Sequence, residues 1–429
     1  MTSLRPTADG AAVASAGLLL LVALAFGGRP QGGFDTAVHA AALPVIGLAV
    51  WRWRFDMLGR WQKLMFAVLI AMLTLALLQL LPIPVGMYEM LPGRQQIVAD
   101  LARAGVTPRF LPLTVDRWAT VRALVALACF TAMWMLCTTL KHGDRVRLAK
   151  LALLAALPLA IIGFVQASLK PDTTGATALF ANRNHYASLM AMLVPLAFAA
   201  AREDRARRYR AGSIAWLVSA VLLLLAAAMS FSRAGFLLAG LAAVAAVFVG
   251  GDIRRSGRTI APLLAVGLAL AAVGYFASDR LAARFAADWV ADLRWQYLAN
   301  GWTVLVSWLP WGSGLGTFPG VYGAAEGTKS LAEFSHAAYA HNEIVQVGIE
   351  AGWPGLALLG VFLGTVVAAA ASRMRGHARS AWAGAAVIAI AVALLHSLVD
   401  YPLRTFACSL LLALSLSLLL PARRTEAMG

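Results

Sequence analysis

Charged residues are scarce in this chain, and acidic residues are the scarcest of them. Only 13% of the 429 residues are charged, with 20 Asp and Glu against 36 Lys and Arg, while 61% are hydrophobic. This composition excludes an ordinary soluble protein and indicates a polytopic membrane protein. The net charge of +16 lies in short runs between apolar segments. Such runs are typical of topology signals and of contact with anionic lipid, so no nucleic-acid partner is expected.

Cysteine is also rare, with Cys129, Cys137 and Cys408 as the complete set. Cys129 and Cys137 lie on one predicted helix with about 12 Å of rise between them, which is beyond disulfide reach. We expect three apolar packing residues and no redox or metal framework. The sequence also lacks an Asp-x-Asp pair, so we predict an activity that needs neither a metal nor another cofactor.

Long apolar runs make up most of the chain. A helix needs about 20 apolar residues to cross a bilayer, so we predict an all-α protein with about twelve transmembrane helices in a single integral membrane domain, residues 1–429. The first run has no convincing cleavage site followed by a soluble domain, and we expect it to be a retained span. The predicted spans lie near 11–28, 37–51, 64–85, 117–140, 148–169, 184–201, 212–231, 234–250, 260–277, 353–371, 381–398 and 404–420.

Basic residues predict how the spans are oriented. Lys and Arg gather in alternate connecting loops, for example at 52–63 and 202–210, and positively charged loops stay in the cytoplasm. Both termini are therefore placed in the cytoplasm. The opposite face carries two sizeable loops, at 86–116 and 278–352. The second loop is rich in Trp and Tyr, and part of it is expected to lie on the membrane as interfacial helix.

Four arginines fall at the outer ends of spans or in the long outer loop, where the positive-inside rule disfavours them. Charge near the hydrocarbon is costly and usually functional, and a guanidinium can donate two parallel hydrogen bonds to phosphate oxygens. Together these arginines are predicted to hold a lipid-linked pyrophosphate. Two of them also have an acidic neighbour in sequence that offers simple pairing, Asp400 for one and Asp292 for the other. The arginines are Arg183, Arg233, Arg294 and Arg404.

Polar side chains crowd around Arg183 in the run Asn182-Arg183-Asn184-His185-Tyr186. Helix capping needs one such asparagine. We therefore interpret Asn182 and Asn184 as parts of a site wall, with capping as the alternative.

His341 follows the long outer loop in the run His341-Asn342-Glu343. Histidine titrates near neutral pH and can accept the proton of an attacking hydroxyl. Glu343 is the candidate to orient it. A helix is expected from His341 to a break at 352–355. The glycine-rich run at 312–316 lacks the strand and lysine of a nucleotide loop, so no nucleotide site is predicted.

These segments together resemble the O-antigen ligase and O-antigen polymerase family. The resemblance runs over roughly 175–360 and rests on the order and spacing of short motifs. It implies a C-type glycosyltransferase architecture with one larger periplasmic loop. Where the family often has Ser-Arg-Gly-Ala, this chain has Ser-Arg-Ala-Gly. The motifs are Phe180–Ala187, Ser232–Gly235, Arg294 with the Trp302–Phe318 run, and His341–Glu343 with the Glu350–Gly355 run.

The resemblance further implies an enzyme of the bacterial inner membrane that transfers a glycan from undecaprenyl pyrophosphate to an acceptor hydroxyl. Transfer would take place at the periplasmic face, with inversion and without a metal. Carried over by motif, Arg183, Arg233 and Arg294 would bind the lipid pyrophosphate, and His341 would be the functional histidine. The implied partners are the undecaprenyl-pyrophosphate-linked donor, a lipid A–core or other glycan acceptor, and membrane lipid.

Other functions stay open at this point. Within the family, the alternatives are a polysaccharide polymerase and a protein O-oligosaccharyltransferase. A secondary transporter of an anionic solute belongs to another class, and the scarcity of ionisable residues in mid-span disfavours it. The outward arginines disfavour a purely structural assembly protein.

Overall fold

The computed structural model describes residues 5–29, 34–169, 175–249, 293–323, 337–375 and 380–420, together with Gly267 and Ala271. Within these ranges, seven helices are long and apolar enough to cross a membrane. This confirms the prediction of an all-α polytopic membrane protein. The seven are α1 (Arg5–Phe26), α3 (Arg60–Gln79), α6 (Arg117–Thr139), α7 (His142–Leu169), α8 (Arg183–Ala206), α9 (Arg210–Met229) and α15 (Glu343–Arg375).

Four further helices occupy predicted spans. One of them contains Pro44 and follows the span near 37–51. The predicted span 260–277 and the first part of the long outer loop lie almost wholly outside the described residues, so the number of about twelve spans stays a prediction. The four helices are α2 (Phe34–Arg52), α10 (Arg233–Phe248), α16 (Ala381–His396) and α17 (Phe406–Leu419).

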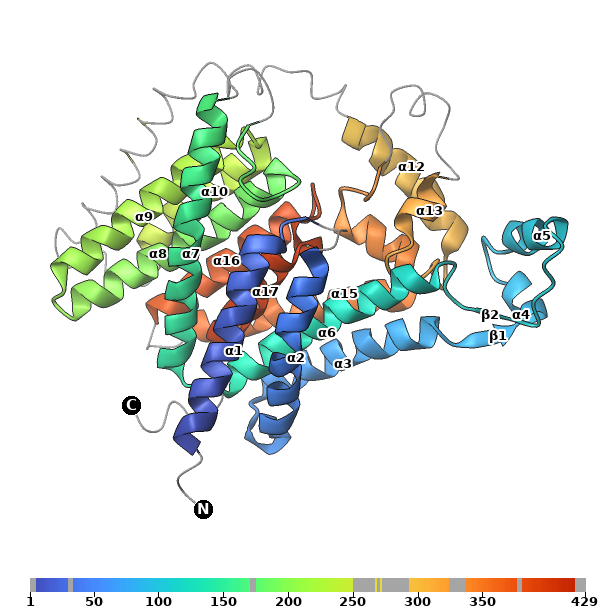
Figure 1. Cartoon of the computed structure of the whole chain (residues 1–429), viewed down its shortest axis with the longest axis horizontal. Coiled ribbons are helices and arrows are strands. Elements are labelled where there is room, and N and C mark those ends of the chain that lie inside the picture. The colour runs from blue at the N-terminus through green and yellow to red at the C-terminus, as the bar shows by residue number, and fades with distance from the viewer. Residues whose placement is uncertain are drawn as a thin grey trace.

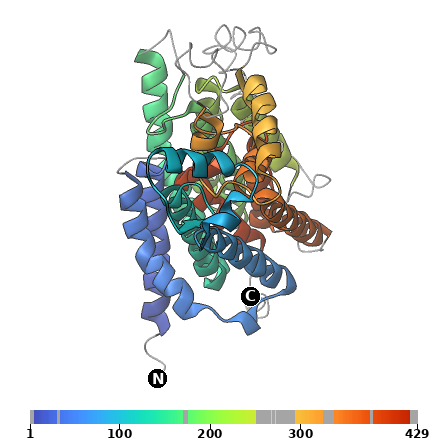
Figure 2. The same ribbon diagram turned by 90° about the vertical axis from the view of Figure 1, so that its right-hand side faces the viewer.

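Helix α8 forms the centre of the bundle. Its membrane-crossing window is entirely buried, and it packs against α9, α10 and α16. A helix that is apolar on all sides belongs in a protein core, and the alanines of α8 allow its neighbours to approach closely. Helices α1 and α2 lie side by side in both views, and Figure 2 shows them at one edge of the bundle (Figures 1 and 2).

The first outer loop forms a small folded lobe that the sequence did not predict. Strand β1 (Pro82–Pro84) pairs antiparallel with β2 (Phe110–Pro112), and the lobe projects from the ends of α3 and α6 (Figure 1). The predicted span 64–85 is therefore too long, because α3 ends at Gln79 and prolines at 82 and 84 favour extended backbone. The lobe also contains α4 (Val85–Glu89) and α5 (Gln95–Arg103).

Arg94 ties this lobe to the second outer loop. Its side chain is 2% exposed and donates hydrogen bonds of 2.6 Å to the Leu113 carbonyl and 2.8 Å to the Gly312 carbonyl. The guanidinium also lies 5.3 Å from the ring centre of Trp308, as a cation–π contact. The second loop contributes α12 (Leu293–Trp308) and α13 (Phe318–Gly323).

The glycine-rich run of the second loop supports a break in α15. At Gly352 the backbone leaves the helical region, with φ 58° and ψ −153°. The carbonyls of Ile349 and Glu350 accept hydrogen bonds from the N–H groups of Ser313 and Gly314 at 2.8 and 2.9 Å. The predicted break is therefore confirmed, and the glycine-rich run has a structural role there. Gly314 is required because it has φ 119° and a methyl group would lie 1.9 Å from Thr114 Oγ1.

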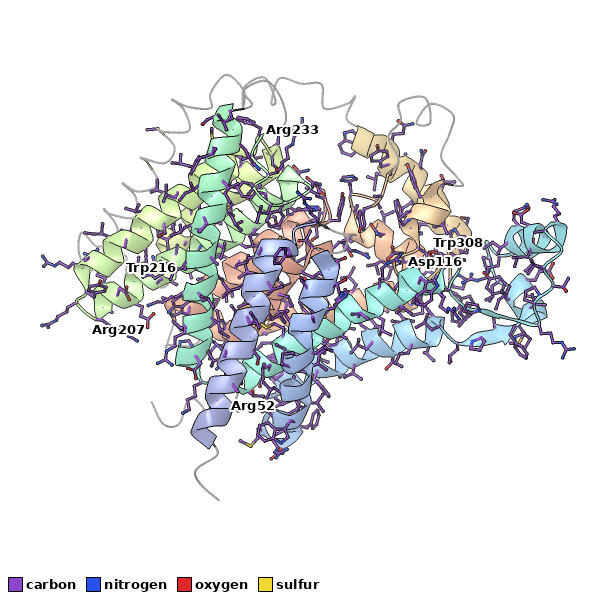
Figure 3. The ribbon with its side chains drawn as sticks, viewed as in Figure 1. Arg52, Asp116, Arg207, Trp216, Arg233 and Trp308 are labelled. Atoms are coloured by element: carbon purple, nitrogen blue, oxygen red, sulfur yellow. The ribbon has the colours of Figure 1, made fainter. Side chains whose placement is uncertain are left out.

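Basic residues of the predicted inner loops lie away from the predicted outer arginines. Arg52 and Arg207 lie low in Figure 3, whereas Arg233 lies at the opposite, upper end of the bundle. This separation of the two sets agrees with the alternation of loops read from the sequence.

Candidate functional site

A buried carboxylate, that of Asp400, gathers polar side chains from separate segments of the chain. Asp400 lies between α16 and α17 and is 0% exposed. Its Oδ2 accepts a hydrogen bond of 2.5 Å from Asn184 Nδ2. Its Oδ1 lies 3.3 Å from His185 Nε2 and 3.4 Å from His341 Nδ1. The first turn of α8, the segment before α15 and the turn before α17 therefore meet at one carboxylate, which we call the Asp400 cluster.

These contacts keep Asp400 ionised. Burial by itself raises the pKa of a carboxyl group. The His185 imidazole at 3.3 Å and the His341 imidazole at 3.4 Å outweigh burial and hold the pKa of Asp400 well below its usual value. The N–H of Tyr401 also donates to Oδ1 at 2.9 Å. Asp400 is therefore a fixed negative charge that can orient both imidazoles.

His341 has an uncommon backbone conformation. Its φ is 51°, in the left-handed region, which costs a residue other than glycine about 1–3 kcal/mol and is concentrated at functional sites. Its side chain is 19% exposed, so a substrate can reach it. Because Nδ1 faces the Asp400 carboxylate, Nε2 is the nitrogen left to accept a proton.

Aromatic rings surround the imidazole of His341. The Tyr297 ring lies nearly parallel to it, with 5.8 Å between ring centres, and the Tyr401 ring meets it edge-on at 4.9 Å. Tyr401 also stacks on Tyr339 at 4.0 Å and contacts His185 edge-on at 4.5 Å. The Tyr401 ring therefore separates the Asp400 cluster from the segment around Tyr339.

A second ionic cluster surrounds Arg404, in the turn η3 (Pro402–Arg404). Its Nη2 lies 2.7 Å from Glu343 Oε1, and its Nη1 lies 3.1 Å from Glu350 Oε2. Burial by itself lowers the pKa of a guanidinium, but the two carboxylates outweigh it and raise the pKa of Arg404 above its usual value. Gln346 Nε2 donates to the other oxygen of Glu350 at 3.0 Å. We call Arg404, Glu343 and Glu350 the Arg404 cluster.

The two ionic clusters correct two predicted pairings. The sequence offered Asp400 as a simple pairing partner for Arg404, as the alternative to phosphate binding, and Glu343 as the candidate to orient His341. Both are wrong, because Arg404 pairs with Glu343 and Glu350 while Asp400 contacts His341. Glu343 and Glu350 lie seven positions apart, which places both on one side of α15. One guanidinium can therefore bridge them.

Two of the predicted phosphate-binding arginines each begin a helix, Arg183 in α8 and Arg233 in α10. Asn182 caps α8, since its Oδ1 accepts a hydrogen bond of 2.8 Å from the Asn184 N–H. Asn182 therefore has the capping role that was the alternative to a site wall, and Asn184 contacts Asp400. Ser232 caps α10 in the same way.

The starts of α8 and α10 pack against each other. A methyl group on Gly235, in the first turn of α10, would lie 2.3 Å from Cβ of Ala187, one turn into α8. The loop before α8 is fixed to the same place, because the Ala176 N–H donates a 2.8 Å hydrogen bond to the Met229 carbonyl at the end of α9. Two arginines and two helix N-termini, which favour anions, thus lie at the same end of the bundle.

An apolar cavity of about 770 Å³ adjoins the Arg404 cluster. Its apolar part is lined from α3, α6, α15 and α17 by residues such as Leu69, Phe130, Phe362 and Leu412. The lining also includes ionisable side chains, those of Arg29, Asp35, His39, Arg122, Tyr339, Glu343 and Arg404.

The structure brings some of the predicted site residues together. His341 and Asn184 share Asp400, while Glu343 and Arg404 pair with each other. Arg294 lies in the first turn of α12, and its side chain is outside the described part of the chain. Sequence reasoning missed Asp400 and Glu350 as members of the site. One feature of the sequence could have identified Asp400, because it is the one acidic residue between 381 and 420. An acidic residue at a membrane boundary is usually functional.

Comparison with known proteins agrees with the motifs. Residues 218–360 match the family model of the O-antigen ligase, which confirms the resemblance. The matched range contains Arg233, Arg294, His341 and Glu343. A search of curated proteins gave no match.

Proposed function

On the premise that the chain carries an O-antigen ligase domain, and is thus a membrane glycosyltransferase at the level of the family, we propose the reaction that it catalyses. It transfers a glycan from undecaprenyl pyrophosphate to an acceptor hydroxyl at the periplasmic face of the bacterial inner membrane. The observation that supports this most strongly is the Asp400 cluster, which presents a partly exposed imidazole held by a buried carboxylate.

The proposed reaction breaks one bond and forms another. The acceptor oxygen attacks C1 of the donor sugar from the face opposite the pyrophosphate, so the anomeric configuration inverts. The C1–O bond breaks, and its electron pair stays on the pyrophosphate oxygen. Arg183, Arg233 and Arg294 stabilise that charge, which grows in the transition state. The proton of the acceptor hydroxyl goes to His341 Nε2. No metal has a part in this scheme.

Purified protein in proteoliposomes tests the whole proposal. With an undecaprenyl-pyrophosphate-linked glycan, a hydroxyl acceptor and a metal chelator, we expect transfer to continue at its full rate. In the same assay, Arg233→Lys keeps the charge but loses the two parallel hydrogen bonds of a guanidinium, and we expect a loss of about tenfold or more. Loss of transfer with chelator, restored by a divalent ion, would contradict metal independence. Full activity of Arg233→Lys would show that Arg233 does not bind the pyrophosphate through two parallel hydrogen bonds and acts only as a topology signal.

Asp400→Asn tests the positioning of His341. Asparagine keeps the size of the side chain but removes the charge that both imidazoles face, and the same change at the carboxylate partner of a general-base histidine in a Ser-His-Asp triad costs about 10⁴-fold. Transfer at the wild-type rate by Asp400→Asn would show that the carboxylate does not position His341.

The direction of pH dependence for Asp400 itself follows from its pKa. The folded-state pKa lies well below the usual 3.8, so the stability that its ionisation contributes is complete above that value. This stability is lost only as the pH falls through the lower folded-state pKa. Near neutral pH, the pH dependence of the wild-type transfer rate therefore does not reflect protonation of Asp400.

A further inference from the structure

The outer lobe has one face that consists of apolar side chains. Its two strands contain only proline, isoleucine, phenylalanine and leucine. Residues that pair across an antiparallel ribbon lie on the same face, so Pro82, Pro84, Phe110 and Pro112 share one face, which we call the ribbon face. Pro82 and Pro84 are exposed, and Phe110 is 59% exposed. An uncovered aromatic ring on an apolar face indicates a contact surface.

The ribbon face is continuous with the lipid-facing surface of α3. Leu77 and Leu78 on the last turn of α3, and Leu81 just before β1, are all exposed. Beyond the ribbon, α4 packs against both strands, and Met90 at the end of α4 is 82% exposed. Monomeric proteins rarely leave so extended an apolar surface in water. The exposed apolar side chains therefore extend from a membrane helix as far as Met90.

The opposite side of the lobe is polar. It is formed by α5, which exposes Gln95, Asp100 and Arg103. The lobe projects sideways from the bundle, with α5 above β1 and β2 (Figure 1). In the same orientation, Arg233 at the predicted outer end lies high and Arg52 at the predicted inner end lies low (Figure 3). The polar side of the lobe thus faces the outer solution, and the strands lie on the side toward the bilayer.

The backbone of the ribbon favours contact with lipid over pairing with another strand. In the part of the chain that the structure describes, no third strand joins the ribbon, so both of its edges are open. Ile83 and Leu111 form the hydrogen-bonded pair, and the backbone positions that face outward are 82, 84, 110 and 112. Three of these four are prolines, which have no N–H. Prolines on an edge prevent the addition of a strand, and fewer N–H groups are then left unsatisfied in an apolar phase.

We propose that the outer lobe lies on the bilayer, with the ribbon face and Met90 inserted among the lipid chains of the adjacent leaflet and α5 in the water above them. The flexible side chain of methionine adapts to irregular apolar surroundings. Trp118, at the base of the lobe, is 64% exposed and carries the Arg117 guanidinium 5.3 Å from its ring centre, and tryptophan prefers the level of the lipid headgroups. Arg94 fixes the lobe to the second outer loop, so the ribbon face cannot turn away from the membrane. This contact does not depend on the reaction proposed above.

Fluorescence from single positions of the full chain tests where the lobe lies. Met90→Cys and Phe110→Cys each place a thiol on the apolar side, and Gln95→Cys, exposed on α5, is the matched control. The three native cysteines are buried, so an environment-sensitive dye reacts with the introduced thiol. The labelled protein is reconstituted in vesicles of phosphatidylethanolamine and phosphatidylglycerol. Met87→Cys, also exposed on α4, is the replacement if either variant does not fold.

Two quenchers distinguish lipid from water. Lipids with brominated acyl chains quench a dye in the hydrocarbon, whereas iodide quenches a dye in water, because an ion does not enter an apolar phase. We expect the dye at positions 90 and 110 to emit at a shorter wavelength than at position 95. It should lose most of its emission in brominated vesicles and little with iodide. The dye on Gln95→Cys should show the reverse.

Two results would overturn the proposal. Equal quenching by iodide at all three positions would place the whole lobe in water. Protection of positions 90 and 110 from both quenchers would show that protein covers the ribbon face, and loss of that protection on dilution into excess lipid would identify the cover as a second copy of the chain. Failure of the proposed function is seen separately, since it would abolish glycan transfer without altering the quenching pattern.

Discussion

Replacing His341 by asparagine is expected to reduce glycan transfer by about 10²–10⁴-fold, the usual contribution of a positioned general base. Asparagine is the informative replacement because His341 has a φ of 51°, and asparagine accepts left-handed backbone better than alanine does. The loss can then be assigned to the imidazole and not to a distorted turn. Initial rates in proteoliposomes, with saturating donor, provide the measurement.

A histidine at the other end of the bundle provides the control. His142 is the first residue of α7, on the side where the inner loops are predicted, and His142→Ala should transfer glycan at the wild-type rate. Donor binding by His341→Asn should also be unchanged, because the proposed function assigns the pyrophosphate to the arginines and not to His341. Normal turnover by His341→Asn would remove this residue from the mechanism.

Replacing Arg404 by methionine is expected to destabilise the fold by about 3–5 kcal/mol, because breaking a buried ion pair leaves its partner charge uncompensated. Glu350 is 0% exposed and Glu343 is 20% exposed, so neither carboxylate can recover its lost partner fully from water. Denaturant unfolding in detergent should show this loss. Adding Glu343→Gln and Glu350→Gln to the same chain should restore most of it, since neutral amides need no counter-charge.

The matched control is an exposed ion pair. Arg103 lies 2.8 Å from Asp100 in the outer lobe, but its side chain is 72% exposed, and exposed pairs contribute only about 0–1 kcal/mol. Arg103→Met should therefore leave stability nearly unchanged. Equal losses for Arg103→Met and Arg404→Met would show that the Arg404 cluster contributes no more than a surface pair.

Most of the described membrane helices could be predicted from the sequence, because apolar run length is the dominant constraint in a bilayer. The predictions were wrong where a factor other than the length of the apolar run determined the structure. Two prolines end α3 before its apolar run does. The outer lobe was missed because its strands have only three residues each, too few for a periodic pattern to be visible.

The site was predictable in its residue types but not in its pairings. An isolated arginine or histidine near the hydrocarbon is unusual in any sequence, so Arg404 and His341 stood out. The acid that each residue contacts depends on how α8, α15 and α17 pack. Proximity in the sequence wrongly suggested that Asp400 pairs with Arg404. Asp400 lies far along the chain from Asn184, its hydrogen-bond partner, and one sequence holds no local signal for such a contact.

The order of synthesis gives the Asp400 cluster a further significance. Asn184, His185 and His341 are translated and inserted before Asp400, and Glu343 and Glu350 before Arg404. Both clusters thus lack their central charge until the segment between α16 and α17 has been synthesised. Since nascent chains fold from the N-terminal side, the earlier members of each cluster are in place before their central charge is made. A nascent chain that ends before Asp400 would lack the carboxylate of the first cluster, and one that ends before Arg404 would lack the guanidinium of the second.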